Sequence, residues 1–216
     1  MKTSFTSAVA LAAAVLTNSA VAQTATPFKG YIGAEYGAVK FKDQTSVASA
    51  LVSAVGGSAS SVQDTGINVG RFFGGINLTE NVGAELGYVM SGAANANFSG
   101  VSRTSVSYSG SASQKVNGFD YSALIRPNLS TGFNGAFLKV GGHSLSIQTD
   151  VSVATGSSSG LSSATTSGTG SLIGIGYDGK INEKLDFRIA YTAYNSVAGI
   201  SGNDTTLWTI GLVGKF

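Results

Sequence analysis

The strongest constraint on this chain is a repeated alternation of apolar with small or polar side chains, in segments separated by connections of alternating length. Period-two alternation predicts β-strands with one face turned to an apolar environment. Three connections are tight, at 79–81, 130–134 and 182–184, and four are long, at 42–65, 92–117, 148–167 and 196–204. Seven connections join eight strands, predicted at 30–41, 66–78, 82–91, 118–129, 135–147, 168–181, 185–195 and 205–216. The pattern therefore predicts an all-β, antiparallel up-and-down fold.

The two faces of the predicted strands differ in chemistry. In the last strand, Trp208, Ile210 and Leu212 lie opposite Thr209 and Gly211. One face is thus apolar and the other small or charged, as lipid outside and a polar lumen inside would require.

The strand predicted at 66–78 fits this scheme poorly. Arg71 shares its parity with Ile67, Val69 and Phe73, and the pair Gly74-Gly75 suggests a β-bulge that would change the facing of the side chains.

The composition argues for a membrane protein. Only 11% of the residues are charged, against roughly 25% in soluble domains, and the mean hydropathy is +0.21. The absence of cysteine excludes a disulfide scaffold, a thiolate metal site, a thiol nucleophile and a lipid-anchored lipoprotein. With 13 basic and 11 acidic residues, the chain offers no electrostatic case for nucleic acid binding.

The first 22 residues are predicted to be a secretory signal peptide. Lys2 supplies a positive start, residues 8–16 form a short apolar core, and Ala20-Val21-Ala22 is an A-x-A cleavage site. The mature protein would then be a single domain, residues 23–216.

No later segment is apolar for the roughly 18 residues that indicate a membrane-spanning helix. Strands of about 9–11 residues cross the hydrocarbon when tilted, and only a closed barrel satisfies every backbone group in lipid. Bacterial outer-membrane barrels have an even strand number, tight periplasmic turns and longer external loops. We therefore predict an eight-stranded antiparallel transmembrane β-barrel, integral to the outer membrane, with both termini on the periplasmic side.

Three stretches carry a resemblance to a known superfamily. The chain closes on residues 208–216 (WTIGLVGKF), which alternate and end in a terminal Phe, and the stretches 30–37 (GYIGAEYG) and 77–88 (NLTENVGAELGY) match the first strand and the first tight turn. The mature chain resembles the eight-stranded barrels of the OmpA-like, OmpX-like and opacity-protein superfamily. The resemblance implies an assembly signal at Trp208, Ile210, Leu212 and Phe216, recognised by the barrel assembly machinery. The chain stops at Phe216, so it departs from members that carry a peptidoglycan-binding domain.

Charged residues on the inward parity form the main candidate site. Counted from the periplasmic turns, seven lie three to seven residues into their strands: Glu35, Arg71, Glu85, Arg126, Lys139, Asp178 and Arg188. Charges in a narrow lumen are costly unless they are paired, so we expect an ion-pair layer that fills the barrel, which the family resemblance also implies. The alternative is a charged constriction that passes small solutes or ions, as a narrow porin.

The sequence indicates no catalytic, metal or cofactor site. His143 is the only histidine, so a multi-histidine metal site is excluded. Ser144 and Ser146 are near it, but Leu145 occupies the position that the His-x-Ser pair of lipid A deacylases would require, and no acid completes a triad.

The long connections suggest a role outside the cell. Segments 42–65 and 148–167 consist almost wholly of small and polar residues, which predicts mobile external loops. Segment 92–117 contains the candidates for contact with a host surface, phage or lipopolysaccharide: Phe98, Arg103, Tyr108 and Lys115. A structural role in maintaining the envelope, a narrow porin and a surface adhesin remain open, and a soluble carrier of lipocalin type would reverse the apolar face.

Overall fold

The computed structural model describes residues 29–41, 60–63, 66–101, 106–127, 134–156 and 158–216. The predicted signal peptide at 1–22 lies outside these residues. So does most of the predicted turn at 130–134. No helix in the described part of the chain is long and apolar enough to cross a membrane.

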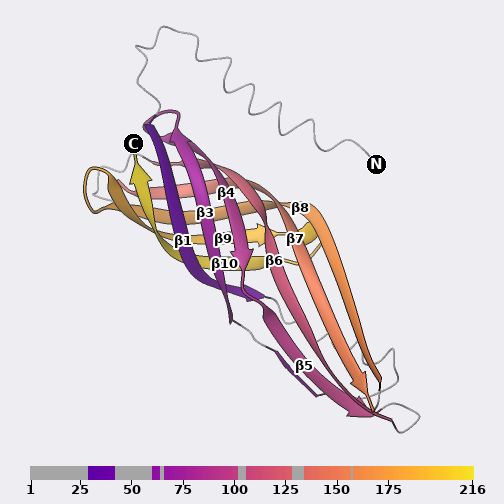
Figure 1. The fold of residues 1–216 in the computed structure, drawn as a ribbon. Coiled ribbons are helices and arrows are strands. Elements are labelled where there is room, and N and C mark those ends of the chain that lie inside the picture. The colour runs from indigo at the N-terminus through magenta and orange to yellow at the C-terminus, as the bar shows by residue number, and fades with distance from the viewer. Residues whose placement is uncertain (1–28, 42–59, 64–65, 102–105, 128–133, 157) are drawn as a thin grey trace, which may run out of the picture.

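Eight antiparallel strands close into a barrel (Figure 1). Its order is β6-β4-β3-β1-β10-β9-β8-β7, and the β6–β7 pairing closes it. This confirms the predicted fold class. The strands are β1 (Lys29–Phe41), β3 (Gly66–Asn77), β4 (Val82–Ser91), β6 (Ser107–Ile125), β7 (Ala136–Thr155), β8 (Ser158–Lys180), β9 (Leu185–Asn195) and β10 (Thr205–Lys215).

Two further strands and one short turn lie outside the barrel wall. β2 (Ser60–Gln63) pairs with β5 (Ala94–Val101), and β5 pairs with the first part of β6. A 3-10 turn, η1 (Val197–Gly199), lies between β9 and β10. The tight turns at 79–81 and 182–184 are present as predicted and lie at the same end of the barrel as the C-terminus (Figure 1).

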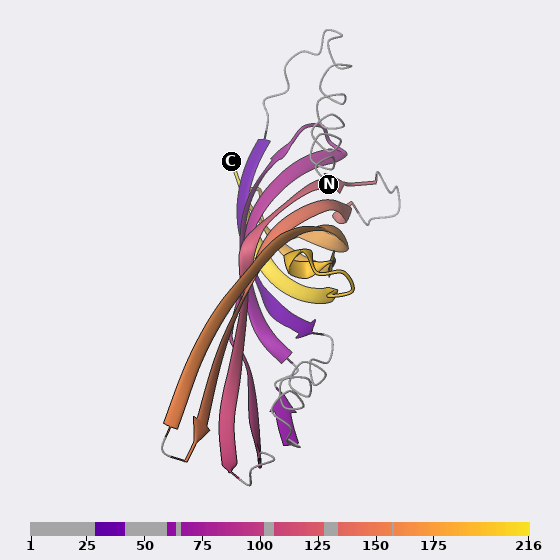
Figure 2. The same ribbon diagram turned by 90° about the vertical axis from the view of Figure 1, so that its right-hand side faces the viewer.

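The expectation of loops at 92–117 and 148–167 is wrong. β6, β7 and β8 contain 19, 20 and 23 residues, and their pairing continues without interruption from the barrel to Thr155↔Ser158. The Ser-, Thr- and Gly-rich sequence does not bury much apolar surface, but the hydrogen-bonded strands of the barrel template the continuation of the ladder. Figure 2 shows these strands extending together well beyond the barrel.

We call this extension the protruding sheet. It comprises β2, β5, residues 107–115 of β6, 148–155 of β7 and 158–167 of β8. It lies at the end opposite to the tight turns and the C-terminus (Figure 1), which is the external end of an outer-membrane barrel.

The predicted bulge at Gly74-Gly75 is also wrong. Gly74 pairs with Ile32 and Leu86, and Gly75 with Tyr31 and Glu85, in an unbroken register. Ile67, Val69 and Phe73 all face the interior together with Arg71. The strand fits the alternation poorly because the lumen is not uniformly polar but has a charged level and an apolar level.

Candidate functional site

The centre of the lumen is a network of buried ion pairs around Arg71, whose side chain is 1% exposed. The Nε and Nη2 atoms of Arg71 donate to both carboxylate oxygens of Asp120, each at 2.8 Å. Nη2 also lies 3.2 Å from Glu85, and Nη1 lies 3.5 Å from Glu35. A guanidinium has a planar fork of donors that matches such bidentate contacts, so Arg71 contacts three carboxylates, from β1, β4 and β6.

Arg188 forms the second centre of the network. Its Nε and Nη2 atoms donate to Asp178 at 2.6 and 2.9 Å. Its Nη1 atom donates to Glu85 and lies 3.6 Å from Glu35. The Nζ atom of Lys139 lies 4.0 Å from Glu85. Glu35 and Glu85 are therefore shared between cations from opposite walls of the barrel.

Arg126 joins this network at its periplasmic edge. Its guanidinium contacts Asp178 at 3.3 Å and donates to Asn77 at 3.0 Å, and its side chain is 18% exposed. The floor of a periplasmic vestibule of about 540 Å³ includes Arg126, Asp178 and Tyr31.

All seven predicted charged residues thus lie inside the barrel and belong to one network. The prediction missed Asp120, because it considered only residues close to the periplasmic turns. Asp120 in β6 has the same parity as Arg126, which directly follows this strand, and that parity is the signal that could have found it. With Asp120, the charges balance as four acids and four bases, which we call the charge layer: Glu35, Arg71, Glu85, Asp120, Arg126, Lys139, Asp178 and Arg188.

Aromatic and hydroxyl side chains complete the charge layer. The ring of Phe73 lies between two guanidiniums, 4.7 Å from Arg71 and 4.6 Å from Arg188, an arrangement favoured by the quadrupole of the ring. The Tyr194 hydroxyl donates to Asp120 at 2.8 Å, and the Tyr31 hydroxyl donates to Glu85 at 3.2 Å. These bonds satisfy carboxylate oxygens that would otherwise be costly to bury.

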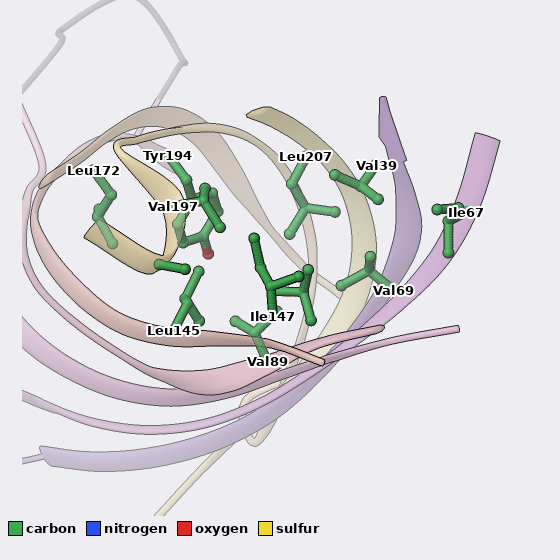
Figure 3. Close-up of a cluster of buried hydrophobic side chains, with 12 residues drawn as sticks. Val39, Ile67, Val69, Val89, Leu145, Ile147, Leu172, Tyr194, Val197 and Leu207 are labelled. Atoms are coloured by element: carbon green, nitrogen blue, oxygen red, sulfur yellow. The ribbon is translucent and has the colours of Figure 1, made fainter. Parts of the chain in front are cut away.

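A second level closes the lumen on the external side of the charge layer. It is a cluster of buried apolar side chains from the strand segments beyond Glu35, Arg71 and Glu85, and from η1 (Figure 3). We call it the apolar plug: Val39, Ile67, Val69, Val89, Val116, Leu145, Ile147, Leu172, Tyr194, Val197, Ala198 and Leu207. A cavity of about 20 Å³ remains within it, which is space for about one water molecule.

The turn that supplies part of the plug has an unusual backbone. Ser196 and Ala198 have φ values of 56° and 57°, a region that non-glycine residues rarely adopt. Val197, 1% exposed, is nevertheless held against the strands. The Val197 amide donates to Asn203 O at 2.8 Å, and the Ser196 amide donates to Asp204 at 3.0 Å. This connection folds inward over the barrel mouth.

His143 lies in the same external half and is fully buried. Its Nε2 atom is 2.9 Å from Asn195 O, and its ring packs 5.5 Å from that of Tyr194. Ser144 is exposed on the opposite face of β7, and Ser146 is hydrogen-bonded to Ser167. This geometry provides no Ser–His pair, and the described residues contain no group of three side chains suited to a metal ion.

The two faces of the protruding sheet differ. The face continuous with the lipid-facing surface carries rows of hydroxyls, with Ser111 and Ser152 hydrogen-bonded at 2.8 Å across β6 and β7. The opposite face includes Phe98, whose ring covers Gly110 on the neighbouring strand. Within the described part of this sheet, Lys115 and Asp150 are the charged residues with described side chains.

Three of the four proposed contact residues are described. Lys115 is exposed, Phe98 is half-buried and Tyr108 is buried, whereas Arg103 lies outside the described residues. Of this set, Lys115 is the side chain best placed to meet a partner.

The residues of the predicted assembly signal lie together on the outer face of the barrel. Trp208, Ile210 and Leu212 project from β10, and Phe216 follows it at the periplasmic end; all are exposed in the isolated chain. They therefore belong to the membrane-facing surface, together with exposed apolar residues of every other barrel strand that crosses the membrane.

Comparisons with known proteins agree with this architecture. The sequence profile of the OmpA-like transmembrane domain family matches residues 27–216. A search of curated protein sequences found no match. Two crystal structures of Ail, the attachment invasion locus protein of Yersinia pestis, are similar in fold, with 10% identity, 88% of this chain and 100% of that chain covered, and TM-scores of 0.51 and 0.50. In the first, Ail is in complex with the heparin analogue sucrose octasulfate.

Proposed function

The chain belongs to the OmpA-like transmembrane domain family and is an integral outer-membrane β-barrel. On this premise we propose that it is a non-conducting anchor that displays a β-sheet for binding at the cell surface. One observation carries this proposal: the ladder of β6, β7 and β8 continues out of a barrel whose lumen is filled at two levels. In this role the barrel preserves the permeability barrier, and the protruding sheet is the functional surface.

The filled lumen favours an anchor over a narrow porin. An eight-stranded barrel has an interior just wide enough for side chains to fill it. An ion on the axis would meet the charge layer, whose cations are already neutralised, and then the apolar plug with its residual cavity of about 20 Å³. A conducting path would require both levels to rearrange.

The unpaired edge and the few charges of the protruding sheet suggest how it binds a partner. Residues 158–167 of β8 pair with β7 on one side and with no other described strand on the second side. Such an edge presents unpaired N–H and C=O groups to which an extended segment of a partner can add. With Lys115 and Asp150 as the charges on described side chains of this sheet, main-chain and hydroxyl hydrogen bonds are a better basis for recognition than charge.

A conductance measurement tests the first half of the proposal. The refolded mature protein, residues 23–216, is placed in a planar bilayer beside a shortened variant in which Asn-Gly replaces residues 150–163. The two-residue turn joins Thr149 and Ala164, which already pair in the ladder. We expect no conductance steps from either protein. Reproducible steps from both would establish a pore and overturn the anchor.

A binding measurement tests the second half. Bacteria that display the wild type, the shortened variant or Lys115→Gln are compared for adhesion to epithelial cell monolayers and for binding of sucrose octasulfate. We expect the shortened variant to lose adhesion and Lys115→Gln to retain it. Adhesion that depends on Lys115 would instead indicate an anionic ligand. Unchanged adhesion of the shortened variant would contradict binding at the β8 edge of the protruding sheet.

A further inference from the structure

Three glycines on the membrane-facing surface have open space where a side chain would stand, and no other atom of the protein fills it. A Cβ atom at Gly74 would approach no closer than 3.9 Å to Tyr31 O; at Gly214 the nearest atom is Ile32 O at 3.8 Å, and at Gly70 it is Met90 Cγ at 3.7 Å. At Gly37 and Gly211, by contrast, a Cβ atom would overlap a backbone carbonyl oxygen of the neighbouring strand. Packing within the barrel therefore does not explain the three outward glycines.

Glycine inside a strand weakens it and often marks a bulge, a tight bend of a barrel, or a site where a ligand or another backbone approaches closely. The unbroken register of β3 excludes a bulge at Gly74. Two of these glycines flank one side chain, because Ile32 pairs with Gly214 on one side and with Gly74 on the other. Gly74 in turn pairs with Leu86. The surface of β10, β1, β3 and β4 is thus notched, with troughs at the glycines between ridges of larger side chains.

The trough at Gly74 widens into a groove of about 680 Å³. Its floor includes Ala34 and Gly87, and its walls include Phe72 and the pair Tyr88 and Phe119, whose rings meet edge-on with centroids 5.0 Å apart. Apart from the Tyr88 hydroxyl, every side chain that lines the groove is apolar. The groove is continuous with the surface that faces the bilayer, so the medium that reaches it is hydrocarbon.

The depth of the groove in the membrane indicates which lipid leaflet it faces. Ile32 lies three residues from the periplasmic start of β1, and Gly74 lies three residues from the periplasmic end of β3. At about 3.3 Å per residue, these positions lie within about 10 Å of the periplasmic strand ends, in the inner half of a hydrocarbon core about 30 Å thick. That half consists of phospholipid in an outer membrane.

We propose that this groove is a specific seat for one acyl chain of a periplasmic-leaflet phospholipid. The chain lies against Gly74 between Ile32 and Leu86, and the aromatic wall of Phe72 and Phe119 holds it from the external side. The seat makes this side of the barrel a preferred lipid contact, whereas the side formed by β7, β8 and β9 meets exchanging bulk lipid.

Two single-tryptophan reporters test the seat. Trp208→Phe removes the natural tryptophan, and Phe72→Trp places a reporter in the groove wall, while Ile175→Trp is the matched control. Phe72 and Ile175 are each 57% exposed, and each lies five residues from the periplasmic end of its strand. Both proteins are refolded into phosphatidylethanolamine–phosphatidylglycerol vesicles that contain increasing fractions of phospholipid with brominated acyl chains. Phe119→Trp serves as the groove reporter if Phe72→Trp does not fold.

We expect the groove reporter to be quenched at a lower brominated fraction than the control reporter. Adding Gly74→Leu, whose Cβ atom would meet no atom closer than Tyr31 O at 3.9 Å, should place a side chain in the trough and move the groove curve onto the control curve. Gly70→Leu fills an outward glycine that does not line the groove and should leave the difference unchanged. Coincident curves for the two reporters would overturn the proposal. So would weaker quenching in the groove together with a cross-linked dimer, because a second copy would then cover the surface.

Discussion

β6, β7 and β8 pass through two environments within one uninterrupted ladder, and the two halves of these strands are built differently. Inside the barrel they bury Asp120, Lys139 and His143 and support the plug through Leu145 and Leu172. Beyond the barrel they carry mainly Ser, Thr, Gly and Ala, and of their described side chains there only Tyr108 is buried. The backbone pairing is common to both halves, so the difference lies in side-chain burial. Substitutions should therefore be severe in the first half and mild in the second.

The largest effect is expected where a buried cation is removed. Arg71→Met leaves Asp120 without its bidentate partner and weakens the neutralisation of Glu35 and Glu85. Unpairing a buried ion pair costs about 3–5 kcal/mol, measured as a lower urea midpoint of the barrel refolded in lipid vesicles. Lys115→Met, in the protruding sheet, is the control and should leave the midpoint unchanged.

Replacing both partners of the pair sharpens this test. Arg71→Met combined with Asp120→Leu should recover part of the lost stability, because the double variant removes the carboxylate that Arg71→Met alone leaves buried without its partner. An unchanged midpoint for Arg71→Met alone would show that the charge layer does not stabilise the barrel.

Two glycines of the same hairpin give an intermediate effect and compare its two halves directly. A Cβ atom at Gly141 of β7 would overlap Tyr121 O, whereas a Cβ atom at Gly160 of β8 meets no atom within 4 Å. Gly141→Ala should destabilise the barrel by about 1–3 kcal/mol through overpacking, and Gly160→Ala should change it by less than about 0.5 kcal/mol. Urea unfolding in vesicles measures both, and equal effects would contradict the contrast between the halves.

A smaller effect is expected at the edge of the charge layer. Arg126 is partly exposed, and Asp178 keeps two hydrogen bonds from Arg188 when Arg126 is removed. Arg126→Ala should therefore cost only about 1 kcal/mol in the same unfolding assay, as for other solvent-screened pairs. A loss as large as that of Arg71→Met would mean that water does not reach this edge.

The smallest effect concerns Asp150 in the protruding sheet. Hydrogen bonds from Ser163, at 2.6 Å, and from Gln148 lower the pKa of this exposed carboxyl below its ordinary value. Since the folded pKa is the lower one, the stabilisation is fully present above the ordinary pKa and is lost as the pH falls through the lowered one. Ser163→Ala should raise the pKa in an NMR titration of Asp150, and Ser159→Ala should not. If the pKa of Asp150 is the same in both variants, the hydrogen bond from Ser163 does not lower it.

The barrel parts of the strands were predictable because alternation is local. Glu85 and Val89 occupy inward positions, and Leu86 an outward one, as their parity in β4 requires. The parity of β3 was also informative, but it was misjudged. Ile67 and Val69 share the inward face with Arg71 because the lumen changes from charged to apolar along its length.

The protruding sheet could not be predicted in the same way. Residues such as Ser159, Ser163 and Thr165 are equally typical of loops, and their strand conformation comes from neighbours that already form a ladder. The turn at Val197 was likewise invisible in the sequence, because its burial depends on Asn203 and on the strands around the barrel mouth.

The sequence by itself determined the number of barrel strands, the outward face and the inward position of the charges, because side chains alternate along any extended strand. Only the tertiary structure decided that Arg71 meets Asp120, 49 residues away, that the apolar plug closes the external half, and that three strands continue into solvent. These features depend on the register between strands, and register is set by hydrogen bonds and packing across the closed barrel.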